Sequence, residues 1–183
     1  MPRRADGDVR RARRRRPRDD DEPDRDRPLR APPRREAWRQ LVRDPGALEN
    51  GVEELLRYVS PAHWLPRRAI VDLEIGAVCV RAGTTVVPLL GAANRDPDAF
   101  PDPDRLRLAR PEARRHLALG WGRHFCLGAS LARLEATVAF RELARRFPRL
   151  ELATERLDWT GNAVLRRLAA LPVRPGPEAT RVS

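Results

Sequence analysis

The sequence contains no lysine: all 37 of its basic residues are arginine, against 26 acidic residues and a formal net charge of +11. It has only two cysteines, Cys79 and Cys126, and no Cys-x-x-Cys pair, which excludes a disulfide framework and the common structural zinc sites. No apolar run is long enough to cross a membrane, and no apolar segment follows the basic N-terminus as in a secretory signal peptide. We therefore expect a cytoplasmic protein without a membrane partner.

Residues 1–35 have few apolar side chains. They hold 14 arginines, eight acids and six prolines, but only six apolar residues. So little apolar surface cannot offset the entropy lost on folding, so we expect a disordered leader. An arginine-rich arm on nucleic acid is one interpretation. The segment lacks aromatic residues that would stack on bases, and acids at 19–24 follow the basic run, which favours a solvated tail instead.

From Glu36 onward the sequence has the apolar periodicity of a folded domain, which we assign to residues 36–183. We expect one helix to end near Pro45 and a second to end at Pro61. The spacing i, i+3, i+4, i+7 predicts a buried face on the second helix. That face consists of Val52, Leu55, Leu56 and Val59.

Three short β-like runs follow within residues 69–90, and Pro88 restricts the end of the third to an edge strand or loop. A proline-rich meander (residues 92–115) leads to the strongest helical pattern, "LGASLARLEATVAFRELARRFP", which Pro148 ends. A last strand or hairpin is expected before residue 177. The prediction is an α+β, helix-rich fold. The long helix carries two apolar stripes: Ala136, Phe140, Leu143 and Phe147, and Leu127, Leu131, Leu134 and Val138.

Cys126 lies at the entrance of that helix, in "LGWGRHFCLG". A helix N-terminus favours a thiolate, and Gly122 and Gly128 permit tight turns and close approach to a flat ligand. A lone cysteine is more often a small buried hydrophobe. Two weaker alternatives are zinc held with His124 and His116, and a nucleophile activated by His63.

Glu54 and Arg57, three residues apart on the second predicted helix, would by themselves be a surface ion pair. Together with the cysteine segment they resemble the C-terminal part of a bacterial cytochrome P450, a haem-thiolate monooxygenase. The family signature Phe-x-x-Gly-x-x-x-Cys-x-Gly is matched here by Leu119-Gly-Trp-Gly122-Arg-His-Phe-Cys126-Leu-Gly128. The segments "GTTVVPLLGAANRDP" and "LARLEATVAF" are also similar to the family's wording, in the same order.

The resemblance implies a role for each matched residue. Cys126 would be the axial ligand of the haem iron, and His124 and Arg67 would bind the haem propionates. Gly122, Gly128, Leu119 and Phe125 would complete the loop beneath the haem. Leu119 departs from the signature's phenylalanine, so we expect an altered environment around the sulfur.

The family's Glu-x-x-Arg helix implies a structural network of Glu54, Arg57 and, from the meander, Arg105. The segment "AHWLP" resembles the part of the family that lines the substrate pocket. Its candidates are His63, Trp64 and Leu65. Cys79 is assigned no role.

By resemblance, the cofactor is haem b (iron protoporphyrin IX) and the activity is monooxygenation of a small organic substrate. Electrons would come from NAD(P)H through a ferredoxin and its reductase. The family's long oxygen-activating helix has no counterpart here, so no catalytic residue is expected within this chain. Two hypotheses stay open: an enzyme module that another polypeptide completes, and a non-catalytic remnant of a truncated or frame-shifted gene.

Overall fold

The computed structural model describes residues 33–154, 157–161 and 164–176. The disorder expected for residues 1–32 lies outside this part of the chain. The first described helix begins at Pro33, inside the segment expected to be a leader. The helices are α2 (Pro33–Arg43), α3 (Leu48–Val59), α4 (Leu90–Ala93) and α5 (Ala129–Arg146), and the short 3-10 helices are η2 (Pro45–Ala47), η3 (Ala113–Arg115) and η4 (Gly122–His124).

The described strands form four antiparallel pairs of two to three residues each. β2 and β3 make a tight hairpin in which Glu74 lies opposite Cys79, and Gly76 turns the chain with φ +60°. The third β-like run forms a strand only before Pro88, as predicted. The pairs are β1 (Arg67–Arg68) with β4 (Thr85–Val86), β2 (Leu73–Ile75) with β3 (Val78–Val80), β5 (Glu151–Leu152) with β8 (Val173–Arg174), and β6 (Trp159–Gly161) with β7 (Arg166–Leu168).

α3 ends as the sequence predicts, just before Pro61. Ser60 takes a left-handed conformation with φ 46°, and its hydroxyl donates to the carbonyl of Arg57 at 2.8 Å. This cap turns the chain away from the helix, while the backbone N–H of Ser60 bonds to Leu56 at 2.9 Å. The first predicted helix likewise stops at Arg43, before Pro45.

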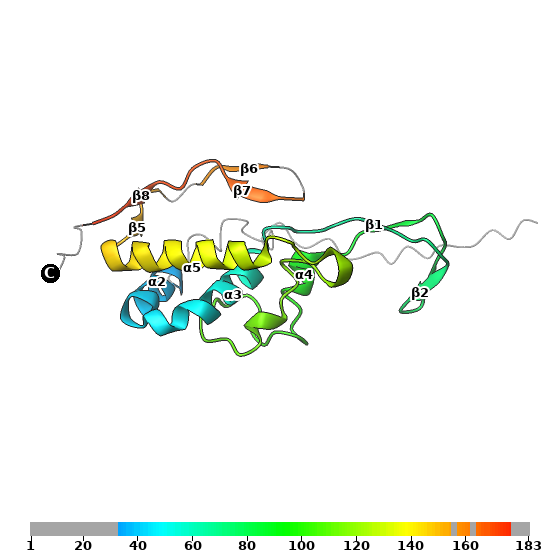
Figure 1. Cartoon of the computed structure of the whole chain (residues 1–183), viewed down its shortest axis with the longest axis horizontal. Coiled ribbons are helices and arrows are strands. Elements are labelled where there is room, and N and C mark those ends of the chain that lie inside the picture. Colours follow the sequence, from blue (N-terminus) through cyan, green and yellow to red (C-terminus); the bar gives the residue numbers. More distant parts are fainter. Residues whose placement is uncertain (1–32, 155–156, 162–163, 177–183) are drawn as a thin grey trace, which may run out of the picture.

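A small apolar core joins α2, α3, α5 and the meander. Leu41, Leu48, Val52 and Leu108 are buried at its centre, and Phe140 of α5 packs against them. Figure 1 shows α5 lying along α2 and α3, while the β2–β3 hairpin extends away from the helices. No helix in the described ranges has the length and apolar character needed to cross a membrane.

The predicted buried face of α3 is only partly correct. Val52 is buried, but Val59 is 46% exposed. The two most deeply buried side chains of α3, Glu54 and Arg57, are instead charged and have no exposed surface, and Glu53 is buried as well. The apolar spacing therefore located the helix, but it did not identify the polar side that the meander covers.

Candidate functional site

The cysteine loop (residues 117–128) connects the meander to α5 and is held mainly by its own backbone. The N–H of Cys126 donates to the carbonyl of Leu119 at 2.9 Å, and the N–H of Phe125 donates to Gly122 at 3.0 Å. The carbonyl of Cys126 then accepts from Ala129, the first residue of α5, at 3.1 Å. Cys126 is thus fixed on both sides of its Cα by hydrogen bonds.

Two glycines of the loop require their lack of a side chain. Gly120 has φ +78°, and a Cβ there would lie 3.2 Å from the carbonyl oxygen of His124. Gly122 has φ +65°, and the space where its Cβ would project is open. Gly128 has an ordinary φ of −83°, so the backbone conformation does not explain its glycine.

Cys126 is exposed and unpaired with Cys79. This excludes the buried-hydrophobe interpretation of its thiol. Large apolar side chains beside it are also exposed: Trp121 by 80%, Phe125 by 49% and Leu127 fully. Among the described residues, no three His, Cys, Asp or Glu side chains are grouped as a metal site would need, so the zinc alternative has no ligand set there.

A second cluster lies behind the loop, where α3 meets the meander. Glu54 and Arg57 have no exposed side-chain surface and form a two-pronged ion pair, with Nε–Oε2 at 2.7 Å and Nη2–Oε1 at 3.0 Å. Arg57 also donates to the carbonyls of Asn94 at 2.7 Å and Pro103 at 2.9 Å. The surface ion pair that spacing alone suggests is therefore a buried network.

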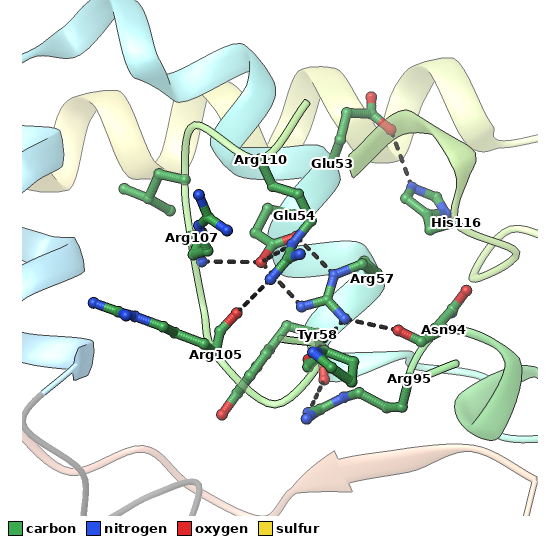
Figure 2. A network of polar contacts seen from close by, with 12 residues as sticks. Glu53, Glu54, Arg57, Tyr58, Asn94, Arg95, Arg105, Arg107, Arg110 and His116 are labelled. Carbon is green, nitrogen blue, oxygen red and sulfur yellow. Dashed lines mark hydrogen bonds and ion pairs between the residues drawn. The ribbon is translucent and has the colours of Figure 1, made fainter. Parts of the chain in front are cut away.

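The meander arginine of this network is Arg110, and the prediction of Arg105 is wrong. The Nε of Arg110 lies 3.0 Å from both carboxylate oxygens of Glu54, and neither side chain is exposed. Arg105 is exposed and contributes only its backbone carbonyl, which accepts from Arg110 Nη2 at 2.8 Å. Figure 2 shows the Arg105 side chain extending away from the carboxylate.

Arg110 also donates to the carbonyls of Pro101 and Asp102. One guanidinium therefore satisfies three meander carbonyls as well as Glu54, which explains its complete burial. Burial by itself acts to raise the pKa of Glu54, but the hydrogen bonds from Arg57, Arg107 N–H and Arg110 outweigh it, and the pKa is lowered. Glu54 is accordingly ionised and holds two buried cations.

Glu53, the neighbour of Glu54, makes a separate cluster. Its carboxylate accepts from Arg133 of α5 at 2.6 Å and 3.0 Å and contacts His116 Nε2 at 3.0 Å. Figure 2 shows Glu53 and His116 facing each other apart from the Glu54 network. Neither Glu53, His116 nor Arg133 was predicted in this role. The only signal was a pair of adjacent glutamates on one helix, which periodicity alone does not interpret.

The other predicted site residues have less defined surroundings. His124 and Arg67 are both exposed, and Arg67 donates to the carbonyl of Pro66 at 2.9 Å. His63, Trp64 and Leu65 are half-buried and are held through their backbone in part, since His63 N–H bonds to Val164 at 2.9 Å. None of these positions lines either of two cavities in the described part of the chain, one between α2 and α5 and one beside η2 and the meander.

A family model described as Cytochrome P450 matches residues 46–160, well over half of the chain. The chain belongs to the cytochrome P450 family. The matched range begins in η2 and contains α3, the meander, the cysteine loop and α5.

Individual P450 relatives are similar in sequence to this chain over most of its length. The chain is 48% identical to 6-deoxyerythronolide B hydroxylase of Saccharopolyspora erythraea over 134 residues, which are 72% of this chain and 33% of that protein. It is 42% identical to the polyketide biosynthesis cytochrome P450 PksS of Bacillus subtilis, over 73% of this chain and 34% of the relative. The chain thus spans about a third of the length of these curated relatives.

Solved P450 structures have the same fold. The tirandamycin C-bound P450 monooxygenase TamI superposes with a TM-score of 0.73 at 43% identity, covering 77% of this chain and 36% of that one. The structure of PksS gives a TM-score of 0.69 at 42% identity, covering 73% and 35%. The expected fold, the C-terminal part of a P450, is therefore confirmed.

Family membership implies a haem, and the cysteine loop fits one. The haem of a P450 takes one protein thiolate on the iron, and its ring and propionates suit apolar and basic side chains respectively. Cys126 supplies an exposed thiol, Phe125 and Leu127 supply exposed apolar surface, and His124 is an exposed basic group in the same loop. Cys126 is the residue that would bind the haem iron.

Proposed function

We propose that this chain is the haem-thiolate module of a P450 monooxygenase that acts on a small organic substrate. The observation that carries the proposal is the exposed thiol of Cys126 on a backbone-fixed loop, flanked by exposed apolar side chains. Haem, when bound, would supply the oxygen-activating chemistry. The chain's own part is to present the sulfur and to orient the haem through His124 and Arg67.

Water exclusion is where the chain needs a partner. One stripe of α5, together with Leu127 two residues before the helix, presents apolar side chains that stay largely exposed in the described part of the chain. They are Leu127 (103% exposed), Leu131 (58%), Leu134 (60%) and Val138 (48%). A closed, dry site is what monooxygenation requires. We propose that activity depends on polypeptide equivalent to the rest of a P450, with electrons from NAD(P)H delivered by a ferredoxin and its reductase.

Reconstitution with haem tests the first part. The full chain is purified, loaded with haem, reduced and exposed to carbon monoxide, and its absorption spectrum is recorded. A thiolate-type spectrum that Cys126→Ala abolishes and Cys79→Ala leaves intact supports the proposal. Cys79 is a matched control because its thiol is also exposed but lies on β3.

Failure of the wild-type chain to take up haem would contradict the module and favour the non-catalytic remnant. The DNA upstream offers a second test. A segment resembling the family's central helix in another reading frame would indicate that residues 1–35 are a frame-shift product and that the complete gene encodes an enzyme. Equal salt-dependent DNA binding by the full chain and by residues 36–183 would exclude a nucleic-acid-binding arm.

A further inference from the structure

Glu53 is buried but takes no part in the Glu54 network. Its side chain is 4% exposed, and its two partners come from opposite sides of the cysteine loop. His116 immediately precedes the loop, and Arg133 lies in the second turn of the helix that follows it. We call residues 116–119 and residues 129–133 the two stems of the loop. The Glu53 carboxylate therefore links both stems to α3.

The His116 side of this link has a defined proton arrangement. Its Nδ1 accepts the backbone N–H of Ala118 at 3.1 Å, so the neutral ring carries its proton on Nε2 and donates to Glu53. Burial lowers the pKa of His116, and this outweighs the opposing effect of Glu53. The neutral ring is therefore the form that satisfies both partners.

The stem that begins at His116 is hydrogen-bonded to the backbone of Cys126. Ala118 is bonded to His116, and the next residue, Leu119, supplies the carbonyl that accepts the N–H of Cys126 at 2.9 Å. Leu117 is held as well, since its N–H donates to Asn94 Oδ1 at 2.7 Å. Hydrogen bonds of three consecutive residues, 117–119, thus connect the His116 anchor to the backbone of Cys126.

The Arg133 side holds the other stem. Its guanidinium binds Glu53 with two hydrogen bonds, a geometry that fixes orientation as well as distance. The hydrogen bond to Glu53 raises the pKa of Arg133, and this outweighs the opposing effect of partial burial. Arg133 is therefore a cation that stays paired with Glu53.

We propose that Glu53 is a positioning residue for Cys126, because its carboxylate clamps both stems of the cysteine loop through His116 and Arg133. The proposal rests on the proposed function only for the assignment of Cys126 as the iron ligand. The clamp itself is a property of the ligand-free chain. A purely structural ion pair would stabilise the whole fold without a selective effect on the loop.

Amide hydrogen exchange of the full, haem-free chain separates these two roles. We expect Glu53→Gln to speed exchange of the Ala118 and Cys126 amides by about tenfold relative to the core amides of α3. Glu142→Gln is the matched control, because Glu142 also binds two arginines, Arg145 and Arg146, but on the surface of α5. That control should leave loop exchange unchanged.

Two histidine variants test each half of the His116 link. His116→Asn keeps an acceptor where Nδ1 meets Ala118, whereas His116→Gln keeps a donor where Nε2 meets Glu53. We expect the asparagine variant to preserve slow exchange at Ala118 better than the glutamine variant. If Glu53→Gln does not fold, Arg133→Gln replaces it, since that side chain is 32% exposed and its loss is milder.

The clamp would be refuted if loop and core amides accelerated equally, or if the loop amides did not change. With haem bound, the same variants should reduce the share of the thiolate-type carbon monoxide spectrum. A chain that takes up no haem would contradict the proposed function, but the exchange result would still decide the role of Glu53.

Discussion

The two sides of α5 differ in what their apolar residues contact. On the inner side, Ala136 and Phe140 pack against the core formed with α2, α3 and the meander. On the outer side, Leu131 and Leu134 are 58% and 60% exposed. The sequence pattern of the two stripes is alike, so periodicity indicates that a face is apolar but not which partner covers it.

The largest effect should come from removing the charge at the centre of the buried network between α3 and the meander. Glu54→Gln leaves the buried cations of Arg57 and Arg110 without a counter-charge, so we expect a loss of about 3–5 kcal/mol in the free energy of unfolding. Urea unfolding of the full chain measures it. A loss similar to that of the surface variant Glu142→Gln would mean that the network does not stabilise the fold.

A matched pair of leucines sharpens the contrast. Leu108 is 2% exposed in the core, so Leu108→Ala should cost about 2–5 kcal/mol. Leu131→Ala on the outer side should change stability by no more than about 0.5 kcal/mol and should reduce self-association of the chain. Unfolding curves and sedimentation measure these two quantities. Equal costs would show that the outer stripe is covered in solution.

A pair of arginines tests the meander in the same way. Arg110→Ala leaves three meander carbonyls without their donor and should cost about 1–3 kcal/mol. Arg105→Ala should have little effect, because only its backbone carbonyl takes part. A larger loss of stability in Arg105→Ala than in Arg110→Ala would show that the Arg105 side chain belongs to the network.

The smallest effect is a pH dependence of the free energy of unfolding, which comes from the cluster of Glu53, His116 and Arg133. Burial lowers the pKa of His116 below 6.5, with Glu53 opposing and Arg133 assisting that shift. The unfolded chain therefore binds a proton that the folded chain rejects, and stability should fall as the pH drops below about 6.5. Below about 4.5, Glu53 adds to the loss: burial alone would raise its pKa, but the hydrogen bonds and charge of Arg133 outweigh burial and lower the pKa in the folded chain, so the unfolded chain takes up the proton first.

Unfolding measured above and below pH 6.5 detects the histidine contribution. His116→Asn should flatten the curve in the window just below 6.5 and leave the acid-limb loss from Glu53 in place. An unchanged slope in that window would assign the dependence to another group.

Much of the fold follows from local signals in the sequence. Pro45, Pro61 and Pro88 end their elements where predicted, and the glycine-rich segment around Cys126 forms an exposed loop before α5. These features depend on residues that are near one another in the chain.

What the sequence does not determine is the pairing across the irregular meander. Arg105, Arg107 and Arg110 lie within six residues of one another, and no local pattern distinguishes them. The packing of the meander decides which guanidinium reaches Glu54. The Glu53 cluster was missed for the same reason, since Glu53 and His116 are separated by 63 positions.

Trp121 gives the cysteine loop its own optical reporter. Its indole is 80% exposed, whereas the other three tryptophans are at least half-buried. Its fluorescence should therefore lie at the long-wavelength, water-exposed end of the emission. Any molecule that settles over the loop should shift or quench that emission, so occupancy can be followed in a cuvette without a label.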